Sequence, residues 1–109
     1  MPRRLGLRAD ISILPAVLEE AESSFTLEIR RAVEKAEGRA VSRAAVYITL
    51  ERLGEKGLVS WKSMVPSNAR RALAQRRYTV TPAGMAALRE AEAEAAANWE
   101  RLAAAVGKL

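Results

Sequence analysis

Apolar residues recur at helical spacing through the first half of the chain. Three groups follow intervals of three or four positions: Leu14, Val17, Leu18 and Ala21; Phe25, Ile29, Ala32, Val33 and Ala36; and Val46, Leu50 and Leu53. This period places each group on one face of an α-helix. The pattern therefore predicts three amphipathic helices that pack through these faces.

Residue types that favour helix ends flank the three groups. The candidate N-caps are Ser12, Ser24 and Ser42, whose hydroxyl oxygens can accept from the unpaired N–H groups of a first turn. Gly38 and Gly57 follow the second and third groups, and glycine is the residue that most often ends a helix. The third helix is thus expected to begin after Ser42 and to end at Lys56-Gly57.

The pattern changes to strand character after the third helix. Residues 58–61 form one short apolar run, and residues 77–81 alternate Tyr78 and Val80 with polar neighbours. The connection over 64–76 is longer than an ordinary hairpin loop, and loops of that length are commonly functional. The sequence predicts a two-stranded hairpin with a long loop.

A long final helix is predicted from Thr81-Pro82, an N-cap followed by a proline at the first helical position. Alanine and glutamate dominate up to Val106, and Gly107 is expected to end the helix. Apolar or small residues recur every seven positions, as in a coiled-coil seam: Leu88, Ala95, Leu102 and Leu109, with Ala91, Asn98 and Ala105 three positions after the first three. The predicted dimer-interface residues are Leu88, Ala91, Ala95, Trp99, Leu102 and Val106.

Helix, helix, helix, strand, long loop, strand, helix is the element order of a winged helix-turn-helix. The predicted fold class is α+β, mainly α, in a single domain over 1–109. Residues 9–81 form its winged-helix DNA-binding part and residues 82–109 its C-terminal dimerisation helix. In this fold the third helix enters the major groove of DNA, and the wing lies along the backbone or the minor groove.

Composition excludes several kinds of chemistry. The 109 residues include no Cys and no His, so disulfides, thiol nucleophiles, the usual zinc sites and histidine relays are absent. No apolar run approaches the roughly 20 residues of a membrane span, and no apolar segment of secretory type follows the basic residues at 1–4. We expect a cytoplasmic binding protein with no catalytic residues, metal or cofactor and no membrane partner.

Positive charge is concentrated in two segments. Residues 1–8 carry three Arg and no acid, and residues 60–81 carry five basic residues and no acid, in a chain whose formal net charge is +5. Such clustering is typical of a surface that binds a polyanion, although a basic loop can also serve solubility alone. We favour double-stranded DNA as the partner.

The predicted third helix carries residue types suited to DNA. Arg43 can donate to a base edge or a phosphate, and Tyr47 and Thr49 can hydrogen-bond phosphate oxygens. Ala44 and Ala45 are small enough to allow close approach. The alternative interpretation is an ordinary amphipathic helix with a solvated polar face.

Residues 42–59 resemble the PadR-like family of transcriptional regulators. They read Ser-Arg-Ala-Ala-Val-Tyr-Ile-Thr-Leu-Glu-Arg-Leu-Gly-Glu-Lys-Gly-Leu-Val, similar to the family's Ser-x-x-x-Val-Tyr-Pro-x-Leu-x-x-Leu-x-x-x-Gly-Leu-Val. Glu-Ile-Arg-Arg at 28–31 and Tyr-Thr-Val-Thr-Pro-Ala-Gly at 78–84 are similar to the flanking family segments. The resemblance covers residues 11–90.

The resemblance implies a homodimeric repressor that binds operator DNA through the third helix and the wing and dimerises through the C-terminal helix. Some members of the family respond to aromatic small molecules bound near that interface. Ser42, Ala45, Tyr47 and Thr49 match recognition-helix positions, and Arg76 and Tyr78 match the wing. Together with the cations predicted above, the DNA-binding residues are Ser42, Arg43, Ala45, Tyr47, Thr49, Arg70, Arg71, Arg76, Arg77 and Tyr78.

Three sites along the chain depart from the family pattern. Ile48 replaces a proline, and Thr26-Leu27 replace a Gly-Tyr pair before Glu28. At 71–76 the chain reads Arg-Ala-Leu-Ala-Gln-Arg where the family has Gly-Gly-Arg-Pro-Arg-Lys. Because Ala and Leu favour helices more than Gly and Pro do, we expect a wing tip that is partly helical or shaped for a different groove.

Several residues keep two interpretations. Trp99 is either a dimer-interface or core aromatic or a stacking wall for a flat apolar effector, and Asn98 either sets the register of the seam or is exposed. Trp61 is expected to pack against the helices, and the carboxylates of Glu90, Glu92 and Glu94 form a solvated face.

Two further function classes stay open beside the regulator. One is a winged-helix protein–protein interaction module with little specific DNA binding. The other is an enzyme, for which no Glu or Lys site is found.

Overall fold

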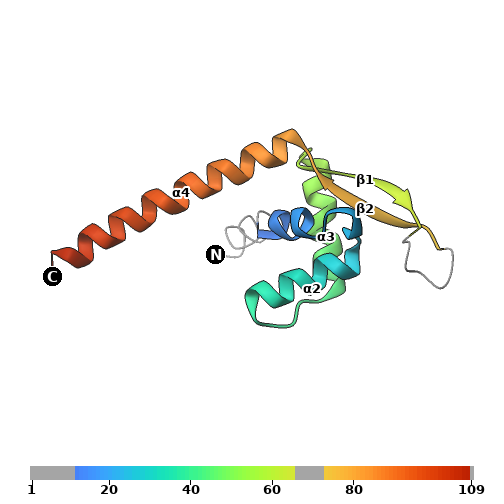
Figure 1. Ribbon diagram of the computed structural model, residues 1–109, viewed down its shortest axis with the longest axis horizontal. Coiled ribbons are helices and arrows are strands. Elements are labelled where there is room, and N and C mark those ends of the chain that lie inside the picture. The colour runs from blue at the N-terminus through green and yellow to red at the C-terminus, as the bar shows by residue number, and fades with distance from the viewer. Residues whose placement is uncertain (1–11, 66–72, 109) are drawn as a thin grey trace.

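The computed structural model describes residues 12–65 and 73–108. In these ranges the chain forms a helix over 12–20, a short 3-10 turn η1 (Ala21–Ser23), helices α2 (Thr26–Glu37) and α3 (Arg43–Glu55), strands β1 (Val59–Met64) and β2 (Gln75–Val80), and a final helix α4 (Pro82–Gly107). Figure 1 shows the first three helices and the hairpin gathered into one body, from which α4 projects as an arm. The winged helix-turn-helix expected from the sequence is confirmed.

The core lies between the three N-terminal helices and the base of the hairpin. Its buried residues come from every one of these elements: Ile13, Leu14, Ala16, Val17, Ile29, Val33, Val46, Leu50, Leu53, Val59 and Tyr78. The prediction for the first helix was wrong at Leu18, which is 43% exposed, and at Ala21, which is exposed and lies in η1 after the helix. Ile13 and Ala16 occupy the inner positions instead, so the buried face is rotated from the predicted stripe.

The start of α2 also differs from the prediction. Phe25, and not Ser24, is the N-cap, and no side chain caps this end. Ser24 is fully buried, and its carbonyl accepts from the N–H of Tyr78 at 2.9 Å. This backbone bond fastens β2 beside the start of α2, which takes Ser24 out of the capping position.

Both ends of α3 agree with the prediction. The Ser42 hydroxyl oxygen accepts from the N–H of Ala45 at 3.0 Å, and Gly57 takes a left-handed φ of 75° just after the helix. Gly38 ends α2 with a φ of 70°. A left-handed residue after a helix lets the chain turn away, and glycine adopts that conformation without strain.

Two side chains of α2 hold the turn that leads into α3. The Arg30 guanidinium donates to the carbonyl of Val41 at 2.9 Å, and the N–H of Val41 donates to the Glu34 carboxylate at 2.9 Å. Both polar groups of the residue before the Ser42 cap are therefore satisfied by one helix. These two hydrogen bonds to Val41 fix where α3 starts.

The hairpin is longer than predicted. β1 pairs antiparallel with β2 from Val59↔Val80 to Met64↔Gln75, so both strands extend into the segment expected to be loop. Over 73–76 of the predicted wing tip no helix forms, since Gln75 and Arg76 are strand residues and Leu73 and Ala74 have no regular structure, whereas 66–72 lie outside the described residues. Because opposite residues share a face, Trp61, Arg76 and Tyr78 lie on the face toward the helices, and Lys62 and Arg77 on the outer face.

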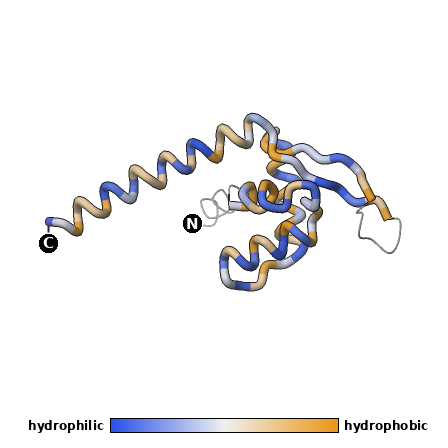
Figure 2. Tube along the Cα trace, in the orientation of Figure 1, coloured by the Kyte–Doolittle hydropathy of each residue, from blue (hydrophilic) through white to orange (hydrophobic). Residues whose placement is uncertain are grey.

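The base of α4 is tied to the turn between α3 and β1. Thr81 caps α4 by accepting from the N–H of Gly84 at 3.1 Å, while its hydroxyl donates to the carbonyl of Gly57 at 2.6 Å. Gly84 is buried. At its other end α4 includes Gly107 and has its C-cap at Lys108, one residue later than expected. Figure 2 shows hydrophobic and hydrophilic residues interleaved along the projecting arm.

Candidate nucleic-acid interface

The first two turns of α3 present an open face. Val46, Leu50 and Leu53 are buried on the inner side, as expected, and the opposite side exposes Arg43, Ala44, Tyr47 and Ile48. Ile48, which stands where the resembling family has proline, is 52% exposed. An aliphatic side chain on such a face can contact a thymine methyl group in the major groove.

A surface groove joins this face to the wing. It is lined by Thr26 of α2, by Arg43, Ala44 and Tyr47 of α3, and by Gln75 and Arg76 of β2. The three elements meet there because the Tyr78–Ser24 backbone bond holds β2 against the start of α2. The groove combines cationic, hydroxyl and amide groups with the first turn of a helix, whose N–H groups favour anions.

The predicted α3 residues do not all face this groove. Ala45 and Thr49 line a different hollow, formed with the first helix, α2 and Val41. The hydroxyl oxygen of Ser42 already accepts from a backbone N–H as the cap of α3. The structure therefore brings Arg43, Tyr47 and Arg76 together and places Ala45 and Thr49 on another side of the helix.

Arg76 is held by contacts to both the wing and α3. Its Nη1 forms an ion pair with Oε1 of Glu51, and its guanidinium carbon lies 4.1 Å from the ring centroid of Trp61 and 5.5 Å from that of Tyr47. The neighbouring Tyr78 hydroxyl and Glu51 carboxylate raise the pKa of Arg76 above its ordinary value, so the guanidinium stays charged. We call Arg76, Glu51, Trp61 and Tyr47 the Arg76 cluster.

Two sequence-based assignments on the hairpin need correction. Tyr78, expected to contact DNA, is only 1% exposed and is part of the core, so its side chain is not available to a ligand. Burial raises the pKa of its hydroxyl. Trp61, expected to pack against the helices, does face them but stays 45% exposed, and the guanidinium of Arg76 lies over its ring.

The outer face of the wing holds a pair of like charges. Lys62 and Arg77 are cross-strand partners, and no ion pair joins either to an acid within 12–65 and 73–108. Like charges placed directly opposite destabilise a sheet, so an anionic ligand would relieve this pair. Lys62 was not among the predicted site residues, because its partner depends on a register that the sequence did not reveal. Arg70 and Arg71 lie outside the described residues.

The sequence of the chain matches the model of a known protein family. The model of the transcriptional regulator PadR-like family matches residues 13–90. The chain belongs to the PadR-like family. Members of this family are DNA-binding transcriptional regulators and not enzymes. A search of curated protein sequences gives no match.

Solved structures share the PadR fold over nearly the whole chain. A candidate transcriptional regulator from Thermoplasma acidophilum has 20% identity and a TM-score of 0.72, covering 98% of this chain and 97% of its own. A PadR-like transcription factor from Bacteroides fragilis has 20% identity and a TM-score of 0.67, with 97% and 93% covered. A PadR family regulator from Eggerthella lenta has 22% identity and a TM-score of 0.64, with 99% and 88% covered. At these identities the similarity establishes the fold, the long C-terminal helix included.

The C-terminal helix of this PadR-like chain carries large apolar side chains that stay exposed within the described residues. Trp99 is 68% exposed and Leu102 is 54% exposed, and Val106 beyond them is exposed as well. One groove runs along this side of the helix, lined by Ser12, Ala91, Glu94, Ala95, Asn98, Trp99 and Leu102. Leu88 differs from the other predicted interface residues, because it packs on the core of its own chain.

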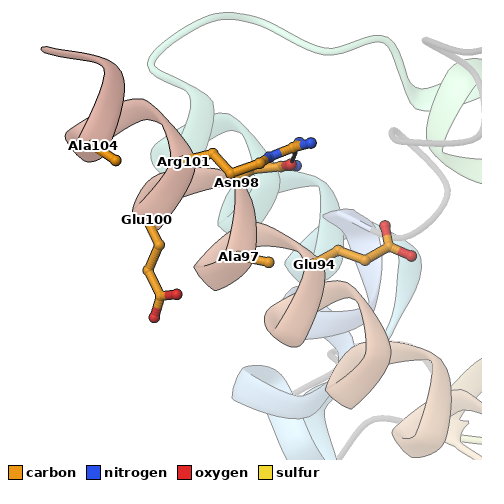
Figure 3. A pocket seen from close by; sticks show the side chains of 6 residues that line it. All are labelled: Glu94, Ala97, Asn98, Glu100, Arg101 and Ala104. Atoms are coloured by element: carbon orange, nitrogen blue, oxygen red, sulfur yellow. Dashed lines mark hydrogen bonds between the residues drawn. The ribbon is translucent and has the colours of Figure 1, made fainter. Parts of the chain in front are cut away.

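A second side of α4, which shares Glu94 and Asn98 with this groove, is more polar. Figure 3 shows a shallow hollow lined by Glu94, Ala97, Asn98, Glu100, Arg101 and Ala104. Arg101 donates to Oδ1 of Asn98, whereas the side chains of Glu94 and Glu100 point in different directions. In the part of the chain that the structure describes, no three His, Cys, Asp or Glu side chains are grouped to hold a metal ion, and no helix is long and apolar enough to cross a membrane.

Proposed function

We propose that the protein is a homodimeric transcriptional repressor that binds operator DNA through α3 and the wing and pairs through α4. The groove between the start of α3 and β2 is the observation that carries the DNA-binding part of this proposal. It joins a cationic helix face to a cationic hairpin within a PadR-like fold. The repressor role rests on the family resemblance. In this role the DNA-bound dimer would block a promoter, and the protein would act in the cytoplasm.

In this proposal Arg43 is the main base-reading residue. It lies in the first turn of α3, is exposed, and forms no ion pair within the described residues. Ala44 beside it allows the helix to approach the bases, and the exposed Ile48 supplies an apolar contact. Arginine donates two hydrogen bonds to guanine in the major groove, a contact that discriminates between bases.

The wing supplies phosphate contacts in this proposal. Lys62 and Arg77 on its outer face have no acidic partner among the described residues, and Arg70 and Arg71 add positive charge to the sequence between the two strands. Such contacts position a protein on the duplex and carry no sequence information of their own. Most of the affinity from this segment should therefore depend on salt.

The apolar face of α4 is the proposed dimer interface. A helix with an unpartnered apolar stripe is stabilised by pairing with another, and a twofold dimer would present two copies of α3 to a pseudo-palindromic operator. A flat aromatic effector stacked on Trp99 is a second proposal for the same groove, supported by the exposed indole beside apolar lining residues. Quenching of tryptophan emission by aromatic ligands, lost in Trp99→Leu, would test it.

Fluorescence anisotropy with labelled DNA tests the proposed function. The probes are the duplex upstream of the protein's own gene and a scrambled duplex of equal length, each titrated from about 50 to 200 mM salt. We expect tighter binding to the upstream duplex and a log–log salt slope of about −0.9 per phosphate contacted. Equally weak binding to both duplexes would instead favour the protein–protein interaction module.

Arg43→Ala should remove the preference for the upstream duplex at a cost of about 1–3 kcal/mol. Arg89→Ala is the matched control, because Arg89 is an exposed arginine on α4 and outside the groove. An intact preference in Arg43→Ala would show that α3 reads the DNA through other residues.

A further inference from the structure

Arg76 differs from Lys62 and Arg77, the other described cations of the wing, in having an acidic partner within the protein. Its guanidinium is paired with the carboxylate of Glu51, and its flat face covers the ring of Trp61 at 4.1 Å. Tyr47 borders the same guanidinium at 5.5 Å. By contrast, Arg77 points to the opposite face of the hairpin and has no acidic partner among the described residues.

The partners of Arg76 belong to two elements that follow each other in the chain, α3 and β1. Trp61 lies on β1, whereas Tyr47 and Glu51 lie one helical turn apart on the same side of α3. The backbone connection between β1 and α3 is the turn at 56–58, at the end of the hairpin far from its tip. A side chain that bridges the elements beyond this turn limits how far the wing can swing relative to the helix.

The chemistry of arginine fits this bridge better than it fits a phosphate contact. A guanidinium can stack its plane on an aromatic ring and direct its N–H groups to a carboxylate at the same time, which lysine cannot do. Glu51 would otherwise place an unpaired negative charge on the helix that faces DNA. With Arg76 beside it, this charge is neutralised, and so is that of Arg76.

We propose that Arg76 is a positioning residue that ties the wing to α3 through Glu51, Trp61 and Tyr47, and that it does not bind a DNA phosphate. This inference rests on the proposed DNA-binding function. It predicts that Glu51, although acidic, is needed for tight binding to DNA. A simple electrostatic expectation is the opposite, because removing an acid from a DNA-binding face should strengthen binding.

DNA titrations of five variants separate the two roles of Arg76. If Arg76 positions the wing, Arg76→Ala, Arg76→Lys and Glu51→Gln should each weaken binding by about fivefold, the change that an exposed cation–π contact and a half-exposed ion pair account for. The salt slope should stay unchanged, and the double variant Arg76→Ala/Glu51→Gln should bind no more weakly than either single one. Arg77→Ala, the neighbouring cation on the outer face, should instead reduce the slope by about one.

A phosphate-binding Arg76 would give a different set of results. Arg76→Lys would bind nearly as well as the parent, Arg76→Ala would reduce the salt slope by about 0.9, and Glu51→Gln would bind more tightly. Any of these three results would overturn the positioning role. Glu55→Gln is the matched control for charge, because Glu55 is an exposed acid on the same helix with no ion pair within the described ranges.

The tie can also be measured without DNA. The chain has two tryptophans, so its nitrogen–proton NMR spectrum contains two indole signals, which Trp61→Phe assigns. Arg76→Ala and Glu51→Gln should both move the Trp61 signal and leave that of Trp99 in place, whereas Arg77→Ala should move neither. An unmoved Trp61 signal in both variants would overturn the tie even if the protein binds DNA.

Failure of the proposed function gives a distinct result. If the parent protein binds no duplex at low salt while the Trp61 signal responds to Arg76→Ala, the tie exists but does not serve DNA binding, and the positioning role is overturned. Thermal unfolding of each variant shows whether weaker binding comes from loss of the fold, and Arg76→Lys provides a milder substitution if Arg76→Ala is unstable.

Discussion

Gly84 is a residue at which α4 lies close to the turn between α3 and β1. A Cβ atom placed there would lie 2.2 Å from the Leu58 carbonyl oxygen and 2.7 Å from a methyl carbon of Val80. The first of these neighbours is backbone and cannot rotate away. The backbone of Gly84 is helical, a conformation that any residue can adopt. Glycine is therefore required here only because there is no room for a Cβ atom.

We therefore expect Gly84→Ala to lower the free energy of unfolding by about 1–3 kcal/mol, the usual effect of overpacking a close contact. Urea denaturation followed by circular dichroism measures it. Gly54→Ala is the matched control, because Gly54 lies in α3 with nothing within 4 Å of a new Cβ. That variant should gain up to about 1 kcal/mol from helix propensity. Equal stability in the two variants would contradict the close approach.

Tyr78 gives a prediction for alkaline pH. Burial raises the pKa of its hydroxyl above the ordinary value near 10. Above that pH the unfolded state loses the proton while the native state keeps it, so the free energy of unfolding should fall as pH rises between the unfolded and native pKa values. Below about pH 10 both states hold the proton, and this contribution is constant.

In Tyr78→Phe the part of the alkaline loss due to Tyr78 should disappear, which urea denaturation at pH 8 to 11 measures. At neutral pH the variant should be within about 1 kcal/mol of the parent, because the hydroxyl makes no hydrogen bond within the described part of the chain. Tyr47→Phe, which removes an exposed hydroxyl, serves as the comparison and should keep the loss. The interpretation fails if Tyr78→Phe keeps the same slope as the parent.

At the scale of elements, the turn between α2 and α3 sets the position of α3, the helix proposed to face DNA. Arg30 and Glu34, one turn apart on α2, satisfy both backbone groups of Val41. Glu34→Ala removes an acceptor from a partly buried N–H, so we expect a loss of about 1–2 kcal/mol in stability. Because α3 begins two residues later, binding to the upstream duplex should weaken as well.

The control for this variant is on the same helix. Glu37 pairs with Arg39 at 3.1 Å in an exposed ion pair, and such pairs contribute little. Glu37→Ala should therefore change stability by less than about 0.5 kcal/mol and leave DNA affinity unchanged. Comparable losses of stability and of DNA affinity in both variants, measured by urea denaturation and anisotropy, would show that the hydrogen bonds to Val41 have no special role.

At the scale of the whole molecule, the projecting α4 is the proposed dimerisation element. The chain extends 60 × 28 × 24 Å, and the arm carries its apolar residues on one face away from the core. A charge placed in that face would be buried without a partner in a paired helix. Leu102→Asp should therefore raise the dimer dissociation constant by about a hundredfold or more, which sedimentation equilibrium measures.

Ala97→Asp is the matched control for the dimer, because Ala97 lies on the polar side of the same helix. It should leave the mass of a dimer unchanged. A parent protein that sediments as a monomer, or a Leu102→Asp variant that stays dimeric, would exclude the proposed seam. The first result would also require another explanation for the exposed Trp99.

Local chemistry made most of the elements predictable. Ser42, Gly57 and the Thr81-Pro82 pair act within a turn of their own position, so the bounds of α3 and the start of α4 could be read directly. The same holds for the inner face of α3 and for most of that of α2, because a helix repeats every 3.6 residues whatever it packs against. Ala36, near the end of α2, is exposed and was predicted wrongly. Ser24 and Leu18 failed as predictions because distant partners act on them: the β2 backbone engages one, and the packing of the first helix rotates the other.

The sequence by itself therefore determined the order of elements, the family and the concentration of positive charge. Only the tertiary structure decided which of these cations pairs with an acid of the protein and which stays unpaired. The pairing register places Arg76 toward Glu51 and Trp61, and places Arg77 opposite Lys62 on the outer face, although the two arginines are adjacent in the chain. Side chains alternate faces along a strand, so a single residue separates a cation held within the protein from one left for a ligand.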